Sequence, residues 1–354
     1  MNPSSFRVET SFKTNGRVRV LNPSDWNRAA LVAAVNGFNG KVVTVIGDVG
    51  IDRYTVGSVD RISPEAPVPI VWVKEERLKL GLAANVADNL KVLGGVPKML
   101  GVVGRDRSGE DFLALSKEKN IDPSNLVYDD TRKTVLKERI VSDRQQLLRV
   151  DYETPGFISS SAENELIENA KKCISQSGAV IVQDYSKGLL SKSLSDKISL
   201  IAKSSKCPFL VDPNRRNDLS LYSMAGILKP NRKEAEKLSG ISISSQDSLL
   251  EAGDTIMKRS PVEHLVLTLG RDGMALFSRS TESVTIIPTI AREVFDVSGA
   301  GDTVISVLAL TLSTGASLET AAILGNISGG IVVGKFGTAT VTQSEVMTFV
   351  NELG

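Results

Sequence analysis

The hydrophobic positions of this chain fall into short apolar runs that alternate with longer amphipathic stretches. The first run, KVVTVIGD (Lys41–Asp48), is rich in β-branched residues and ends at a Gly-Asp pair, as is typical of a strand buried on both faces. Similar runs follow farther along the chain: AVIVQD, CPFLVD, GILKP and HLVLTLG. This repeated strand–helix–strand spacing predicts an α/β fold, a doubly wound and mostly parallel sheet with helices on both faces.

Two segments break this rhythm. Residues 56–73 contain three prolines, which forbid a helix and disfavour a central strand. Residues 134–153 alternate in polarity like two paired strands. Together the segments predict a small β-sheet that projects from the domain as a lid, although pattern alone leaves an ordinary surface hairpin open. Near the C-terminus, GAGDTVISVLALTLSTG and LETAAILGNISGGIVVG predict two helices that are buried on all sides.

Residues 1–40 are polar and aperiodic, so we expect a partly disordered N-terminal extension with one short helix near Asp25–Val35. A single domain over residues 41–354 should follow. No segment has the apolar core of a secretory signal or the ~20 apolar residues of a membrane span, and we expect a cytoplasmic protein.

Composition excludes several classes of function. Lys and Arg total 42 against 41 Asp and Glu, a net charge of +1 that gives no reason to expect a nucleic acid or a membrane as partner. The two cysteines, Cys173 and Cys207, lie far apart and form no CxxC pattern, which argues against a disulfide framework or a zinc site. The single histidine, His264, opens a strand-like run, so a general base should be a carboxylate or a lysine.

The segment DVSGAGDT (Asp296–Thr303) carries the strongest chemical signal. Gly299, Ala300 and Gly301 would let the backbone approach a phosphate closely, with their N–H groups at a helix N-terminus. Asp302, just inside that helix, could then accept the proton of an attacking hydroxyl. A glycine turn with a capping aspartate is the alternative, but the buried helices behind the segment favour a catalytic role.

Two further segments contain candidate ligands for a nucleotide. In LKPNRKEAE, Asn231 and Glu234 lie three residues apart and could hold magnesium-bound water and phosphates, while a helix capping box explains the same pair equally well. In TLGRDGMALF, Thr268 and Gly270 end a strand where parallel sheets bind ligands. Gly273 marks a hairpin turn that needs a positive φ.

Acidic and amide side chains near the first strand are candidates to bind a sugar. GDVGIDRY places Asp48 and Asp52 just past the strand, and Asp52 is the better candidate for accepting hydrogen bonds from hydroxyls. GLAANVADN opens a helix from which Asn85 could contact the sugar, with a solvated helix residue as the alternative.

These motifs together resemble a known family. DVSGAGDT followed by two apolar helices is similar to the C-terminal signature of the ribokinase or PfkB-type sugar kinases. GDVGIDRY, RISPEAPVPI, GLAANVADNL, RQQLLRVDYE and QDYSKG resemble the bacterial D-glycero-β-D-manno-heptose-7-phosphate kinases. The resemblance covers roughly residues 41–342. It implies a ribokinase-like fold with a β-sheet lid, and ATP-dependent phosphorylation of the heptose 1-hydroxyl on the way to ADP-heptose for lipopolysaccharide.

The resemblance also implies roles for individual residues. Asp302 would be the base, and Gly299, Ala300 and Gly301 would form the anion hole. The residues implied to contact the sugar are Asp52, Gly81 and Asn85. Those implied to line the nucleotide and magnesium site are Asn231, Glu234 (the metal ligand), Thr268, Gly270, Gly273 and Asn326, with Lys187 and Asp212 at strand ends nearby. ATP and Mg²⁺ are the implied cofactors, a monovalent cation is left open, and the lid would form a homodimer contact.

The chain departs from that family in two respects. Relatives usually have two consecutive glycines where this chain has Gly81-Leu82, and leucine at positive φ costs about 1–2 kcal/mol. We therefore expect a negative φ with Leu82 packed under the lid; the other outcome is an obstructed pocket that suits a smaller sugar. Many relatives also carry a nucleotidyltransferase domain after the kinase. Because no HxGH-type segment occurs here, we expect that second activity to be absent.

Three other functions compete with this interpretation. The nearest is a PfkB-type kinase for another sugar or a nucleoside, which Leu82 keeps open. A non-catalytic sugar or nucleotide sensor on the same fold is disfavoured because Asp302 and its glycines are intact. A dinucleotide-dependent oxidoreductase would need GxGxxG after the first strand, and GDVGID does not have that spacing.

Overall fold

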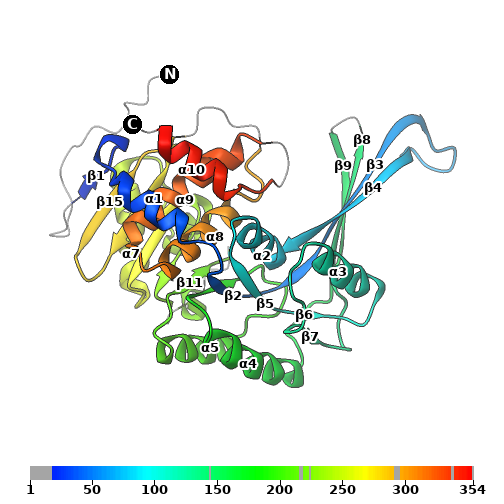
Figure 1. The fold of residues 1–354 in the computed structure, drawn as a ribbon. Coiled ribbons are helices and arrows are strands. Elements are labelled where there is room, and N and C mark those ends of the chain that lie inside the picture. The colour runs from blue at the N-terminus through cyan, green and yellow to red at the C-terminus, as the bar shows by residue number, and fades with distance from the viewer. Residues whose placement is uncertain are drawn as a thin grey trace.

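The computed structural model describes residues 18–142, 145–214, 218–222, 225–290, 296–335 and 339–352. Within them, a nine-stranded central sheet has the order β1-β15-β14-β13-β12-β11-β10-β2-β5 (Figure 1). Its strands are β1 (Val18–Val20), β2 (Val42–Gly47), β5 (Val96–Leu100), β10 (Ala179–Gln183), β11 (Phe209–Asp212), β12 (Ile227–Leu228), β13 (His264–Thr268), β14 (Met274–Ser278) and β15 (Ser283–Ile287). All neighbours pair in parallel except β14, which is antiparallel to β13 and β15. The predicted, mostly parallel sheet is confirmed.

Helices cover both faces of this sheet, as Figure 1 shows. One face carries α1 (Arg28–Asn36), α2 (Ala83–Val92), α8 (Ala300–Ser313), α9 (Leu318–Val333) and α10 (Gln343–Glu352). The other carries α4 (Ser160–Ile174), α5 (Lys192–Ser204), α6 (Arg232–Ser239) and α7 (Gln246–Arg259). The remaining elements are the helix α3 (Arg107–Glu118) and the short segments η1 (Pro23–Asp25), η2 (Leu219–Tyr222), η3 (Gly270–Asp272) and the strand pair β6 (Val102–Val103) and β7 (Val127–Tyr128).

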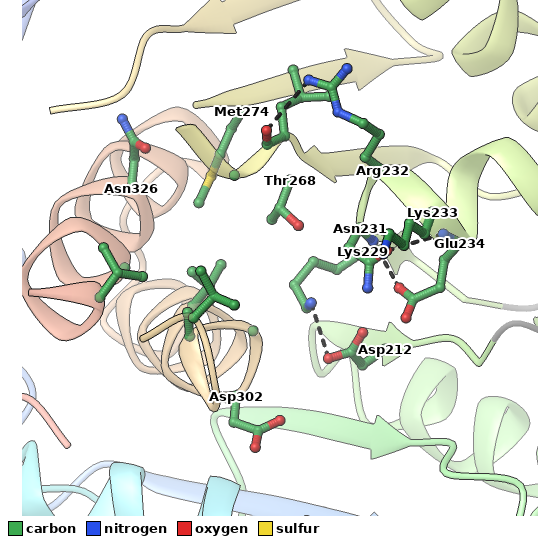
Figure 2. Close-up of a pocket in the computed structure, with 18 of the residues that line it drawn as sticks. Asp212, Lys229, Asn231, Arg232, Lys233, Glu234, Thr268, Met274, Asp302 and Asn326 are labelled. Carbon is green, nitrogen blue, oxygen red and sulfur yellow. Dashed lines mark hydrogen bonds and ion pairs between the residues drawn. The ribbon is translucent and has the colours of Figure 1, made fainter. Parts of the chain in front are cut away.

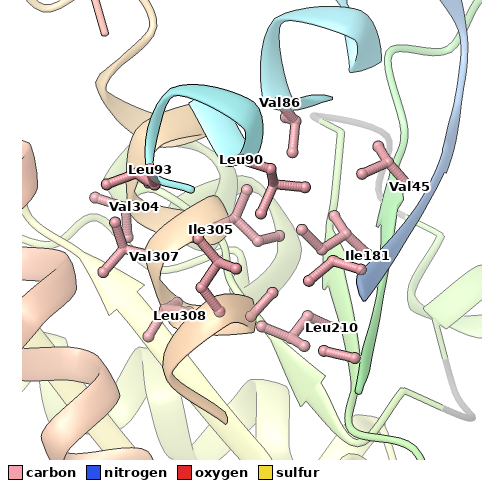
Figure 3. Packing of buried hydrophobic residues seen from close by; sticks show 14 of the residues in the cluster. Val45, Val86, Leu90, Leu93, Ile181, Leu210, Val304, Ile305, Val307 and Leu308 are labelled. Carbon is pink, nitrogen blue, oxygen red and sulfur yellow. The ribbon is translucent and has the colours of Figure 1, made fainter. Parts of the chain in front are cut away.

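The strands are apolar at nearly every position because successive side chains enter two different cores. On β10, Ile181 packs into the core formed with α2 and α8, whereas Val180 and Val182 pack into the core on the opposite face. Figure 3 shows the first of these cores, where Leu90 and Ile305 lie against Ile181. This burial on both faces fixes the strand ends that border the candidate site.

The predicted lid is confirmed as a four-stranded sheet of order β4-β3-β8-β9 that projects from the main body (Figure 1). Its strands are β3 (Val49–Ile62), β4 (Pro69–Leu82), β8 (Val135–Ser142) and β9 (Gln145–Tyr152). The first two extend beyond the expected limits of 56 and 73, directly after Asp48 and directly before α2. Much of β4 is exposed, so apolar and polar residues do not alternate along it. No pattern in the sequence therefore marks where the strand begins and ends.

The N-terminal segment differs from the expected extension. Val18–Val20 pairs in parallel with β15 and thereby joins the edge of the main sheet. Trp26 and Phe38 are buried in the core, and the expected helix is present as α1, capped by the side chain of Asn27. Residues 18–40 are therefore packed against the domain that was expected to begin at residue 41. Residues 1–17 lie outside the described part of the chain.

Candidate active site

The carboxyl ends of the parallel strands meet at one edge of the sheet. Gln183 ends β10, Asp212 ends β11, Lys229 follows β12 and Thr268 ends β13. With α8 and α9 they line a cavity of about 980 Å³ (Figure 2). The strand order reverses direction between β2 and β10, which is where open α/β sheets bind ligands. A cavity of this volume can hold a nucleotide-sized ligand.

The N-terminus of α8 faces this cavity. Gly299 precedes the helix with a φ of 82°, a conformation that glycine adopts without strain. The turn before it is shaped by Asp296, whose Oδ1 accepts a hydrogen bond of 2.8 Å from the Ser298 N–H. A Cβ built on Gly301 would meet Lys229 Nζ first, at 3.7 Å. The partial positive charge of the helix end and the Lys229 ammonium therefore border the same space, which suits an anion such as a phosphate.

Asp302 lies in the first turn of α8, half-buried between the cavity and the lid. Its carboxylate accepts three hydrogen bonds, from Asn85 Nδ2 at 2.6 Å, Tyr185 Oη at 2.9 Å and Gln183 Nε2 at 3.1 Å. Burial raises the pKa of Asp302 above its usual value, while the Asn85 and Tyr185 hydrogen bonds oppose that rise. A carboxylate held in this way can take a proton from a hydroxyl placed beside it.

Lys229 and Asp212 form a buried ion pair at the cavity wall, with Nζ and Oδ2 3.0 Å apart and only 2% of the lysine side chain exposed (Figure 2). Burial raises the pKa of Asp212 to about 7, against the pull of Lys229. Burial would lower the pKa of Lys229, but Asp212 and Glu234 raise it, so the ammonium stays charged. No motif in the sequence pointed to Lys229; the signal that could have found it is a lysine directly after the apolar residues of GILKP.

Asn231 and Glu234 form the capping box that the sequence left open. Asn231 Oδ1 accepts from the Glu234 N–H at 3.0 Å, and Glu234 Oε2 accepts from the Asn231 N–H at 2.8 Å. Both side chains nonetheless line the cavity (Figure 2). The two interpretations of this pair are compatible, because capping fixes the position from which the side chains face the cavity.

The remaining nucleotide candidates gather on the far side of the cavity from Asp302. Thr268, Gly270, Gly273 and Asn326 all line it. The predicted hairpin is confirmed: β13 and β14 are antiparallel, and Gly273 has a φ of 93°. A Cβ on Gly273 would lie 2.1 Å from the carbonyl oxygen of Ile287, so only glycine fits. Asn326 is held by a hydrogen bond of 2.7 Å from its Nδ2 to the carbonyl of Pro288.

The candidate sugar ligands lie on the lid side of Asp302. Asp52 on β3 forms an ion pair of 2.6 Å with Arg139 on β8, and Gly81 lies beside the Asp52 carboxylate. Asn85 contacts Asp302 directly, so it is not the solvated helix residue that the sequence left as an alternative. Asp48 is buried and accepts hydrogen bonds of 3.0 Å from the backbone N–H groups of the loop after β10. Its role is therefore to hold that loop.

Lys187 is not among the residues that line the nucleotide-side cavity. The hydrogen bonds to Asp48 turn its loop toward the lid, where Lys187 Nζ pairs with Glu153 at 2.5 Å. There it borders a smaller cavity of about 160 Å³. The structure thus places Lys187 on the lid side of the site, and its role toward the nucleotide stays a prediction. Lys137 lies nearby, with its Nζ 5.9 Å from the centre of the Tyr185 ring.

Leu82 contradicts the expected backbone conformation. Its side chain is buried, with 8% exposed, at the end of the lid strand β4, but its φ is 58° and its ψ is −135°. The chain must turn sharply here because β4 ends and α2 begins at the next residue. A leucine therefore occupies backbone angles that favour glycine.

A positively charged helix end, a buried lysine and a buried carboxylate at the edge of a doubly wound sheet suit a phosphotransferase that acts on an alcohol group. A more specific assignment comes from sequence: residues 43–345 match the model of the pfkB family carbohydrate kinases, and the chain belongs to that family. The predicted family and the predicted type of enzyme are confirmed.

Several curated relatives are named Bifunctional protein HldE. The chain is 43% identical to the one from Desulfatibacillum aliphaticivorans over 312 residues, 88% of this chain and 63% of the relative. It is 40% identical to the one from Helicobacter hepaticus, over 87% of this chain and 64% of the relative. The chain thus spans less than two thirds of the length of these relatives. They agree with the branch of the family that the N-terminal motifs indicated.

Solved structures with low sequence identity share the fold. The ribokinase of Arabidopsis thaliana complexed with ribose and ATP is 18% identical, with a TM-score of 0.69 over 88% of this chain and 99% of that chain. Phosphofructokinase-2 from Escherichia coli in complex with potassium is 18% identical, with a TM-score of 0.71 over 89% of this chain and 99% of that chain. The predicted ribokinase-like fold is confirmed. Among the described residues, no helix is both long and apolar enough to cross a bilayer.

Proposed function

We propose that this sugar kinase transfers the γ-phosphoryl group of ATP to the 1-hydroxyl of D-glycero-β-D-manno-heptose 7-phosphate. The motifs GDVGIDRY, RISPEAPVPI and QDYSKG and the relatives named HldE support this substrate. The observation that carries the proposal is a group of three cations on the lid side of the base: Lys137, Arg139 and Lys187. A sugar that already bears a phosphate needs such a group at some distance from the reacting hydroxyl.

These cations come from two segments that meet beside Tyr185. Lys137 and Arg139 lie on β8, and Lys187 lies in the loop after β10. Burial and the neighbouring charge of Lys187 lower the pKa of Lys137, so the two ammonium groups are close enough to repel each other. A bound phosphate would relieve that repulsion. Lys187 and Arg139 already hold Glu153 and Asp52, which keeps their side chains extended toward this side of the base.

The residues of the cavity would share the chemistry as follows. The Asp302 carboxylate takes the proton of the sugar hydroxyl. The oxygen of that hydroxyl forms a bond to the γ-phosphorus of ATP, and the bond from this phosphorus to the oxygen that bridges the β- and γ-phosphates breaks. The N–H groups at the start of α8 and the Lys229 ammonium stabilise the charge on the transferring group. The lid, from which Asp52 and Arg139 project, would exclude water from the reacting atoms.

ATP and Mg²⁺ are the cofactors of this proposal. The described residues contain no group of three or more His, Cys, Asp or Glu side chains arranged as a protein-only metal site. The donors present fit Mg²⁺ bound together with a nucleotide, because that ion keeps several waters and uses one or two carboxylates plus phosphate oxygens. Glu234 and Asp212 supply carboxylates at the cavity wall. Mg²⁺ would neutralise charge on the β- and γ-phosphates.

A panel of acceptors tests the proposed substrate. With ATP and Mg²⁺, with and without KCl, we expect heptose 7-phosphate to be turned over far better than ribose, fructose or adenosine.

Asp302→Asn should lower kcat by roughly 10²–10⁴, the usual contribution of a positioned base, while ATP binding persists. Lys137→Met should raise KM for the phosphorylated sugar and leave KM for ATP unchanged. Preference for an unphosphorylated sugar would contradict the proposed substrate, and normal turnover by Asp302→Asn would contradict the proposed base.

We also propose that two copies of the chain associate through their lids. Large apolar side chains are exposed on the lid, among them Ile62, Val68, Trp72, Val73 and Leu148. Exposed apolar patches on soluble proteins mark interaction surfaces, and a self-complementary patch suits a twofold dimer.

A further inference from the structure

The two oxygens of the Asp302 carboxylate have different surroundings. Oδ1 accepts two hydrogen bonds, from Tyr185 Oη at 2.9 Å and from Gln183 Nε2 at 3.1 Å. Oδ2 accepts one, from Asn85 Nδ2 at 2.6 Å. The donors come from different elements, since Gln183 ends β10, Tyr185 follows it, and Asn85 lies on α2. The carboxylate is thus held from both sides.

Each carboxylate oxygen has two lone pairs that can accept hydrogen bonds. On Oδ1 both are used by Tyr185 and Gln183, whereas Oδ2 keeps one that can accept a sugar hydroxyl. We propose that Tyr185 is a positioning residue for the catalytic base: together with Gln183 it occupies Oδ1 and so selects Oδ2 of Asp302 as the atom that takes the proton. This inference rests on the proposed phosphoryl transfer but not on the identity of the sugar.

Tyr185 is suited to this role because it can only donate to Asp302. Burial, followed by the negative charge of Asp302, raises the pKa of Tyr185 well above 10, so its hydroxyl keeps its proton. The ring is also fixed in place. Gln183 Nε2 lies 3.3 Å from Tyr185 Oη, and the Lys137 ammonium on the lid lies 5.9 Å from the ring centre. The tyrosine therefore joins the base to the lid strand β8.

The hydroxyl of Tyr185 also affects the basicity of Asp302. The charged groups that act on this carboxylate are Lys229, which lowers its pKa, and Asp52, which raises it; Asp212 lies near the same side. The Tyr185 and Asn85 hydrogen bonds favour the ionised form. Removing the tyrosine hydroxyl should therefore raise the pKa of Asp302 further. Because the base must be ionised to act, the acidic limb of the kcat profile should then move to higher pH.

Tyr185→Phe tests this proposal, because it keeps the ring and removes only the hydroxyl. With the acceptor that the wild-type enzyme turns over best, we expect the acidic limb of kcat to rise by about one pH unit. At pH values below the wild-type limb kcat should fall about tenfold, with KM for ATP unchanged. Tyr128→Phe, on β7 and outside the site, is the matched control and should leave the profile unchanged. An unshifted acidic limb in Tyr185→Phe would overturn the proposal.

A second measurement does not depend on turnover. In protein labelled with ¹³C at the aspartate carboxyl carbons, the Asp302 resonance is the one missing from Asp302→Asn, and its titration gives the pKa directly. Tyr185→Phe should raise that pKa by about one unit. This result would support the role of Tyr185 even if no sugar phosphate were phosphorylated, which would contradict only the proposed substrate. If Tyr185→Phe did not fold, Gln183→Met would apply the same test to Oδ1, and an unchanged pKa would overturn the proposal.

Discussion

At the scale of single residues, Leu82 is the position where sequence and backbone disagree most. Its φ of 58° and ψ of −135° place a leucine where glycine is favoured, at a cost on the order of 1–3 kcal/mol. Its buried side chain offsets that cost, because burying a leucine contributes about 1.5–3 kcal/mol. Burial of the side chain and strain in the backbone therefore occur together, whereas the sequence suggested that the buried leucine would have a relaxed backbone.

Two substitutions separate these contributions. Leu82→Ala removes the buried side chain and keeps the strain, so we expect a loss of about 2–5 kcal/mol in the free energy of unfolding. Leu82→Gly removes the side chain and the strain together, and should be more stable than Leu82→Ala by about 1 kcal/mol. Denaturant unfolding measures both.

Leu90, buried in the last turn of α2, is the matched control for these variants. There glycine should be less stable than alanine by about 1 kcal/mol, the ordinary order in a helix. The same order at position 82 would show that the backbone there is unstrained.

At the scale of elements, the segment before the first long strand shows how an edge strand escapes a sequence pattern. β1 has only three residues and pairs with β15. The paired residues Arg19 and Thr285 are 266 positions apart in the sequence. Trp26 fills the core behind it, and its Nε1 donates a hydrogen bond of 3.3 Å to the carbonyl of Leu21. Leu21 and Trp26 are buried but are separated by polar residues, so they produce no periodicity and the segment looked like an extension.

Trp26→Ala tests whether this segment stabilises the domain. Because the side chain is 8% exposed and packs into the main core, we expect the free energy of unfolding to fall by about 3–5 kcal/mol. Leu200→Ala, on the exposed side of α5, serves as the control and should change stability by less than about 0.5 kcal/mol. Equal stability of the two variants in denaturant unfolding would mean that the segment packs only loosely.

At the scale of the whole molecule, the lid carries candidate sugar ligands and several large exposed apolar side chains. Trp72 is 70% exposed and Leu148 is 54% exposed, on two different lid strands. The strands β3 and β8 also carry Asp52, Lys137 and Arg139 toward the base. An association of two lids would therefore act on the same sheet that borders the sugar side of the site.

Sedimentation tests the proposed dimer. We expect the wild-type chain to sediment as a dimer and the double variant Trp72→Ser with Leu148→Ser as a monomer, because the exposed apolar area that drives association is lost. Leu200→Ser removes an equally exposed side chain outside the lid and should remain a dimer. A monomeric wild-type chain would contradict the proposal, as would a double variant that remains dimeric.

The sequence by itself determined the features that local patterns encode. Strands buried on both faces are apolar at nearly every position, so β2, β10 and β13 were recognisable one by one. The turn at Gly273 and the glycine before α8 were recognisable because few residues other than glycine adopt a positive φ. The motif around Asp302 combined such a turn with a buried helix, and it indicated both the family and the candidate base.

Only the tertiary structure decided which side chains surround that base. Asn85 and Asp302 are 217 positions apart, and Tyr185 and Asp302 are 117 apart. Their contact depends on strand order and register, which bring the ends of separate strands to one edge of the sheet. The same order placed Lys229 beside the start of α8 and turned Lys187 toward the lid. A local pattern fixes which element a residue joins, whereas its neighbours across the site follow from how distant elements pack.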